Sequence, residues 1–169
     1  MRAGEINHEG EVTLQDQSVA PTGAANQVTL YSSSGEFKFK AGDDNVIGYD
    51  GTEGIPFTFD GAGAAISTGA KGFLEIPFDC VIIGIKLMSD VSTNTVVDIW
   101  KDTYANFPPT DADSITASAT PTLTAATKYS DTTLTGWTTT ITAGDWIRFN
   151  IDSNSAATWL TIQLTVRRT

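Results

Sequence analysis

The feature that most constrains the fold is a period-two alternation of apolar and polar residues that recurs from residue 55 to the end of the chain. Successive side chains of a strand point to opposite faces, so this alternation predicts strands with one buried face and one face in water. No segment shows a convincing helical stripe. The clearest example is the last segment, where Leu160, Ile162, Leu164 and Val166 alternate with Thr161, Gln163, Thr165 and Arg167.

The segments between residues 55 and 169 predict about eight or nine short strands separated by turn residues, the spacing of a β-sandwich or jelly roll. Threonine, which is β-branched and fits a pleated surface, takes up much of the composition, while only 18% of the residues are charged. We therefore expect an all-β fold, a jelly-roll-like β-sandwich. The candidate strands are PFTFD, KGFLEIP, CVIIGIKLM, TVVDIWK, DSITASA, TTLTGW, TTTIT, DWIRFNI and TWLTIQLTVR.

The stretch TTTITAGDWIRFNI, residues 138–151, alternates on both sides of Ala143-Gly144-Asp145. This pattern predicts two antiparallel strands joined by a hairpin turn, without any catalytic role for Asp145.

The N-terminal part has a different composition from the rest. Residues 1–13 are polar and aperiodic, and they predict an extended arm. After them, VTLY and EFKFK flank a Ser-Ser-Ser-Gly turn, which indicates short β-hairpins. Large apolar residues are too few here to form a core, and isolated hairpins are marginal in water. We therefore predict an attachment or oligomerisation segment at residues 1–54 and a sandwich domain at residues 55–169.

Charge limits the partners that the chain can have. The formal net charge is -10 and the pI is about 4.3, with only 10 Lys and Arg residues. Nucleic-acid binding depends on basic residues that neutralise phosphates, so we expect no nucleic-acid partner. The same argument weakens binding to anionic membranes, and no apolar run is long enough for a transmembrane helix. The N-terminus also lacks the apolar block of a secretory signal, so we expect no export by that route.

Catalytic residue types are scarce. His8, the only histidine, lies in the polar arm, and Cys80, the only cysteine, lies among strand residues where a buried thiol is expected. One copy of each does not provide a zinc site. Carboxylates at Asp43, Asp44, Glu75, Asp98, Asp111, Asp113 and Asp145 are interpreted mainly as turn-forming or solvated groups. We expect a protein that is not an enzyme and has no cofactor or bound metal.

Residues 101–114, KDTYANFPPTDADS, interrupt the strand pattern with two adjacent prolines and predict a surface loop. Loops on a rigid sheet are frequent binding sites. Exposed aromatic rings can stack on sugars, so Tyr104, Phe107 and Trp137 are the candidate ligand or receptor contacts. Large aromatics within strands more often fill a core or an interface. The tryptophans in this second group are Trp100, Trp146 and Trp159.

Three stretches carry a resemblance to known proteins. Residues 18–48 resemble a proline, short-strand, turn and Lys-rich-strand module of bacteriophage tail fibres and other virion proteins. Residues 55–123 and 134–151, with VVDIWKDTYANFPPT and GWTTTITAGD, resemble a β-sandwich domain of phage structural proteins. The resemblance implies a non-enzymatic virion protein assembled in the host cytoplasm. It also implies a homotrimer that contacts the major capsid protein or other virion proteins.

Within that resemblance, the chain lacks a repetitive shaft, coiled-coil heptads and a collagen-like repeat. A compact chain of this kind fits a capsid decoration, or cement, protein better than a reaching fibre. Two alternatives stay open: a tail or head fibre that binds a host surface glycan, and, least favoured, a glycan-active enzyme.

Overall fold

The computed structural model describes residues 28–33, 36–41 and 46–48 as strands and residues 51–169 in full. The chain divides into two compact units, Met1–Asp50 and Gly51–Thr169. The predicted arm at residues 1–13 and His8 lie outside the described residues. The second unit begins before residue 55, because its first strand already starts at Thr52.

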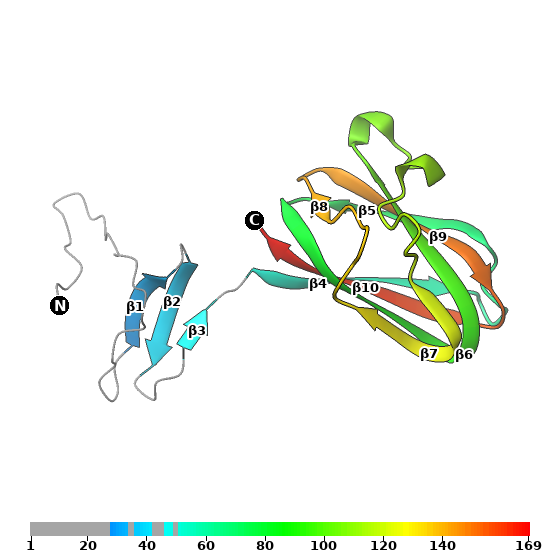
Figure 1. The fold of residues 1–169 in the computed structure, drawn as a ribbon, viewed down its shortest axis with the longest axis horizontal. Coiled ribbons are helices and arrows are strands. Elements are labelled where there is room, and N and C mark those ends of the chain that lie inside the picture. The colour runs from blue at the N-terminus through cyan, green and yellow to red at the C-terminus, as the bar shows by residue number, and fades with distance from the viewer. Residues whose placement is uncertain (1–27, 34–35, 42–45, 49–50) are drawn as a thin grey trace. The chain divides into compact units, whose positions relative to one another are not determined.

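The described residues of the first unit form three strands, β1 (Val28–Ser33), β2 (Glu36–Ala41) and β3 (Val46–Gly48), coloured blue to cyan in Figure 1. They form an antiparallel sheet in the order β1-β2-β3. The β1 and β2 strands correspond to the VTLY and EFKFK segments, and Ser33 of β1 lies opposite Glu36 of β2.

The second unit is an antiparallel sheet of seven strands, which confirms the prediction of an all-β fold. Its pairing order is β4-β10-β6-β9-β5, with β7 and β8 both paired to β6 (Figure 1). The described helices of this unit are two single turns of 3-10 helix, η1 (Tyr104–Asn106) and η2 (Asp111–Asp113). The strands are β4 (Thr52–Asp60), β5 (Gly69–Ile76), β6 (Cys80–Asp102), β7 (Thr122–Asp131), β8 (Thr140–Ile141), β9 (Asp145–Asn154) and β10 (Trp159–Arg168).

The strand β6 joins two segments that the sequence pattern separates, CVIIGIKLM and TVVDIWK. Its first part pairs with β10 and its last part pairs with β9, with shifts of register where it changes partner. The polar residues between the two segments stay in the strand because Thr93 and Thr95 are buried and hydrogen-bond to Asn154. Our prediction of two strands here was wrong, since the polar run is satisfied internally.

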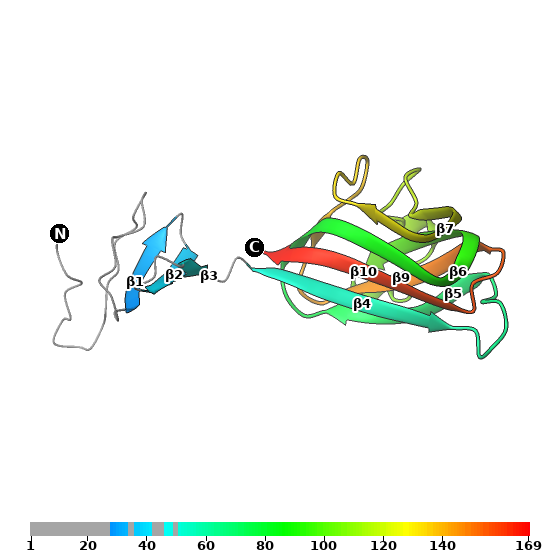
Figure 2. The same ribbon diagram turned by 90° about the horizontal axis from the view of Figure 1, so that it is seen from below.

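The sheet curls until its two end strands, β4 and β5, face each other. The Phe57 ring of β4 stacks on the Phe149 ring of β9, with 4.6 Å between the ring centroids. Gly72 of β5 leaves room for the same ring, because a Cβ atom there would lie 2.5 Å from Phe57 Cζ. In Figure 2 the paired strands β4, β10 and β6 lie in front of β9 and β5.

The core fills the inside of this curl. The predicted apolar phase of β10 is confirmed, since Leu160, Ile162, Leu164 and Val166 have 0% of their surface exposed. Cys80 is buried in the same core, and its burial raises the pKa of the thiol. The prediction that this cysteine behaves as a small hydrophobe is confirmed, and a thiol in this position is poorly suited to act as a nucleophile.

The prediction of a hairpin at residues 138–151 was wrong. Strand β8 pairs with the start of β6, where Ile141 lies opposite Cys80, whereas β9 pairs with β5 and with the end of β6. The turn itself exists: Gly144 has a φ of 89°, and the Asp145 N–H donates to the Thr142 carbonyl at 2.9 Å. Alternation predicts that a segment is a strand, but it does not identify the strand's partner.

Two other predicted strands, DSITASA and TTLTGW, form turns and irregular segments, and strand β7 at Thr122–Asp131 was missed. Each of the first two contributes one buried apolar residue, Ile115 or Leu134, rather than an alternating face. Strand β7 has Leu123 as its one buried side chain, so its sequence carries little periodicity to detect.

Candidate functional site

The loop between β6 and β7 carries the candidate site. It contains η1 and η2, which project beyond the strands in Figure 1. The prediction of a surface loop is confirmed from residue 103 onward, because β6 extends to Asp102. The second turn is capped within the loop: the Thr110 N–H and hydroxyl both donate to the Asp113 carboxylate, at 2.7 and 2.8 Å. Asp113 therefore has a turn-forming role.

Asp98 anchors the loop to the sheet. Its side chain is 5% exposed and points to the outer face of β6. One carboxylate oxygen accepts hydrogen bonds from the hydroxyls of Ser114 and Thr116, at 2.8 and 2.5 Å. The other oxygen accepts from the Trp100 indole N–H at 2.7 Å. A buried carboxylate with this set of donors is satisfied, and it fixes the returning end of the loop.

Arg148 on β9 is a second anchor, which binds the loop at Pro109. Its guanidinium lies over the rings of Phe73 and Trp100, 5.1 and 5.4 Å from the two ring centroids. Its Nη1 donates to the Pro109 carbonyl at 2.9 Å, while its buried Nε has no hydrogen-bond partner among the described residues. The three side chains occupy one cross-strand row, because Arg148 lies opposite both Phe73 and Trp100 in the register.

Three further aromatic rings lie next to Phe73 of this row, and we call Phe73, Tyr104, Phe107 and Trp146 the aromatic cluster. Ring centroids are 4.8 Å apart for Phe73 and Phe107, 5.1 Å for Phe107 and Trp146, and 6.4 Å for Tyr104 and Trp146. Three of the rings stay open to solvent: 75% of Tyr104 and 41% of Phe107 and of Phe73 are exposed. The cluster offers an apolar surface that a ligand can cover.

The structure brings two of the three predicted contact residues, Tyr104 and Phe107, together in the aromatic cluster. Trp137 lies elsewhere: it packs against the core, and its indole N–H donates to the Ala119 carbonyl at 3.0 Å. Trp137 has no ring contact among the residues that the structure describes.

The three strand tryptophans, which we expected to fill a core or an interface, are covered to very different extents. Trp146 and Trp159 occupy the outer phase of strands whose burial alternates, and Trp100 has the same phase because it lies opposite Arg148 in the register. Trp100 is buried under the loop, Trp146 is half-buried in the aromatic cluster, and Trp159 is 51% exposed. Sequence reasoning missed Trp146 as a site residue. The alternation of β9 nevertheless places Trp146 on the same face as Arg148 and Asn150, which is the face away from the core.

Of the other acidic residues considered in the sequence, Asp43 and Asp44 lie outside the described residues, and Asp145 has a structural role. The Asp145 carboxylate is buried, pairs with the Lys101 ammonium at 2.7 Å and accepts from the Thr142 N–H. Within residues 51–169 and the three described strands of the first unit, no group of three His, Cys, Asp or Glu side chains could hold a metal ion.

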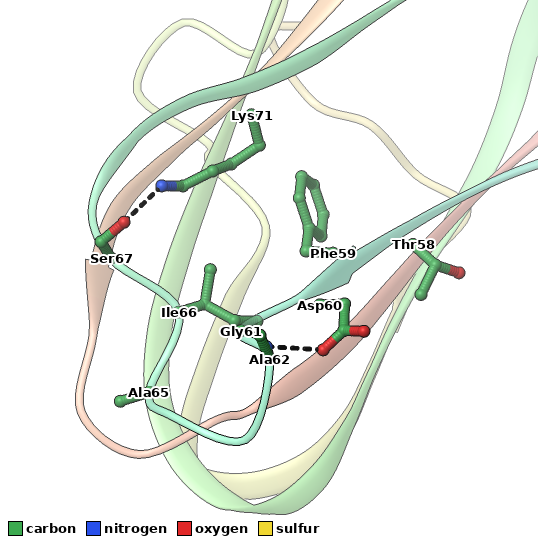
Figure 3. Close-up of a pocket in the computed structure, with 9 residues that line it drawn as sticks. All are labelled: Thr58, Phe59, Asp60, Gly61, Ala62, Ala65, Ile66, Ser67 and Lys71. Atoms are coloured by element: carbon green, nitrogen blue, oxygen red, sulfur yellow. Dashed lines mark hydrogen bonds between the residues drawn. The ribbon is translucent and has the colours of Figure 1, made fainter.

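A small pocket of about 310 Å³ lies at the connection between β4 and β5 (Figure 3). In Figure 3 the Lys71 ammonium points to the Ser67 hydroxyl, to which it donates at 2.8 Å. The Asp60 carboxylate accepts from the Ala62 N–H at 2.7 Å. The polar groups of the pocket thus shape their own loop, which is also held by the buried side chain of Ile66. The aromatic cluster is the stronger candidate site.

Comparison with known proteins adds no relative: no family model, no curated protein and no solved structure matches the chain. Within the described part of the chain, we find no helix of the length and apolarity that crossing a membrane requires.

Proposed function

We propose that the second unit is a jelly-roll sandwich. The proposal is supported by the pairing when β6 is divided at its change of partner. One layer then has the order β4, β10, first part of β6, β8, and the other has the order β5, β9, last part of β6, β7. Strand β7 continues past this second layer, because its end also pairs with Ile85–Met88 in the first part of β6. This is the order in which two Greek keys place eight strands in two layers. The turn at Gly144 then passes from one layer to the other.

On this basis we propose that the chain is a non-enzymatic structural protein of a bacteriophage virion, a capsid decoration protein that attaches through its N-terminal unit as a trimer. The observation that supports it best is the division into two units, because the buried hydrophobic residues of 51–169 form one continuous core. Such a unit can project from a particle while the other unit binds the shell. The net charge of -10 limits aggregation of copies at high local concentration.

The test is a deletion of residues 1–50, which leaves β4 intact. We expect the deleted protein to keep a cooperative thermal transition in circular dichroism and to lose its attachment to purified particles. Particles that bind the deletion variant as well as the full chain would refute attachment through the first unit. Quantitative mass spectrometry of particles separates the roles further, since a shell-covering protein is present in hundreds of copies and a tail protein in a few. Analytical ultracentrifugation of the full chain tests the trimer.

A second candidate, a tail or head fibre that binds a host surface glycan, is favoured by the aromatic cluster. Rings that remain exposed on a loop anchored by Asp98 and Arg148 form a surface that needs no rearrangement to bind. We expect Tyr104→Ala and Phe107→Ala to weaken glycan binding, measured by calorimetry. Trp137→Ala serves as the comparison, because that ring lies outside the cluster. Equal losses in all three variants would argue against a site at the cluster.

A further inference from the structure

The aromatic cluster has an acidic border. In the strand register, Trp146 lies directly opposite Glu75 of β5 on one side and Asp102 of β6 on the other. Directly opposite residues of antiparallel strands have their Cβ atoms about 4.5–5.5 Å apart and project from the same face. A half-buried indole ring therefore lies between two carboxylates, beside the exposed rings of Tyr104 and Phe107.

Both carboxylates can accept hydrogen bonds from a ligand. Asp102 uses one oxygen, Oδ1, for the Thr103 N–H at 2.7 Å and the Asn106 amide at 3.1 Å. The backbone bond from Thr103 is the main cause that lowers the pKa of Asp102, and the Asn106 bond adds to it, so the group stays ionised. The Glu75 carboxylate has no hydrogen-bond partner within residues 51–169, whereas Asp102 also receives a weaker hydrogen-bond contribution from the Thr103 side chain.

The nearby basic side chains already have partners and are not positioned to bind an anionic ligand. Arg148 is held over Phe73 and Trp100 and donates to the Pro109 carbonyl, below the loop. Lys101 is paired with the buried carboxylate of Asp145. An acidic group placed on Trp146 would meet two carboxylates of its own sign without a partner, which disfavours binding strongly.

The two carboxylates attract a cationic ligand, but the aromatic cluster provides no enclosure for one. The rings of Tyr104 and Trp146 are tilted by 38° with centroids 6.4 Å apart, so they do not enclose a cation. Cation–π attraction is weak at such exposed sites. The Arg148 guanidinium, one row away on β9, adds repulsion to a second positive charge.

From these contacts we propose that the unit bound at Trp146 is an uncharged sugar, whose apolar face covers the indole ring and whose hydroxyls donate to Glu75 and Asp102. This inference rests on the glycan-binding role proposed above and specifies its ligand. Neutral hydroxyl groups match carboxylate acceptors on both sides of the ring, and bonds to ionised acceptors are the stronger kind.

The experiment compares oligosaccharides of equal length on the full chain by calorimetry: neutral hexose oligomers, oligomers of uronic acids, and oligomers of amino sugars. We expect neutral oligomers to bind at least about tenfold more tightly than acidic ones. Trp146→Ala should reduce neutral binding by about tenfold or more, as for a central aromatic contact. Glu75→Gln, which keeps an acceptor but removes the charge, should reduce it less than Trp146→Ala and should improve acidic binding.

Trp159→Ala is the matched control, since that tryptophan is exposed on β10 outside the cluster. A thermal melt of each variant checks that the fold is kept. Acidic or amino oligomers that bind as tightly as neutral ones, with binding lost in Trp146→Ala, would overturn the inference while supporting a glycan-binding role. Binding of no oligomer of any class would refute the role itself, and binding unaffected by Trp146→Ala would refute the site.

Discussion

Replacing Asp98 by alanine should destabilise the second unit by about 2–6 kcal/mol, because it leaves two buried N–H donors without their acceptor, at about 1–3 kcal/mol each. The change leaves the Trp100 indole N–H buried without its acceptor, which costs about 1–3 kcal/mol by itself. The hydroxyls of Ser114 and Thr116 lose less, because they lie 3.3 Å apart and can bond to each other. The remaining loss comes from the backbone N–H of Ile99, which donates to the same carboxylate at 2.7 Å.

The assay is urea unfolding of the full chain, followed by circular dichroism. Asp60→Ala is the control, since Asp60 is exposed and accepts one bond, from the Ala62 N–H, and we expect it to cost less than about 1 kcal/mol. Asp98→Asn should fall between the two, because its amide group must present a donor to one of the existing donors. A free energy of unfolding for Asp98→Ala within error of that for Asp60→Ala would refute our account of the loop anchor.

Three further predictions concern packing, the thiol and pH. Gly72→Ala should cost about 1–3 kcal/mol in urea unfolding, because its Cβ would lie 2.5 Å from the Phe57 ring, and Phe57→Leu in the same chain should recover part of the loss. Cys80 should react with an aromatic disulfide reagent only after unfolding, and reaction of the native protein at the rate of a free thiol would contradict its burial. The hydrogen bond from the Thr158 hydroxyl is the main cause that lowers the pKa of Asp90 below its ordinary value of 3.8. A lowered pKa stabilises the fold above the unfolded value and stops doing so as pH falls through the folded value, so the difference in melting temperature between wild type and Asp90→Ala should be constant above about pH 5 and shrink below pH 3.8.

The alternation of the sequence predicted the strand character of the second unit and the orientation of its side chains well. In β10 and β9 the apolar phase became core, and the interrupted pattern after Asp102 became a loop. These features depend only on local periodicity and on residues such as Pro108 and Pro109 that cannot continue a strand. They can therefore be derived from one sequence.

Pairing and long-range burial could not be derived in this way. The length of β6 depends on Asn154, about sixty residues later in the chain, which accepts hydrogen bonds from Thr93 and Thr95. The partner of β8 depends on where β6 begins. The candidate site was incomplete for the same reason: Tyr104 and Phe107 lie in one loop, but Phe73 and Trp146 reach them from two other strands.

The three strand tryptophans show that the loop between β6 and β7 affects how exposed a side chain on the outer face of a strand is. Trp100, Trp146 and Trp159 all project from the outer face of their strands, yet they differ in how far neighbouring groups cover them. Trp100 lies under the loop and is tied to Asp98, Trp146 lies at its margin, and Trp159 lies away from it. Since Asp98 holds the loop at Ser114 and Arg148 holds it at Pro109, the positions of Tyr104 and Phe107 beside Trp146 depend on both anchors. Weakening either anchor should therefore reduce ligand binding even when every residue of the aromatic cluster is intact.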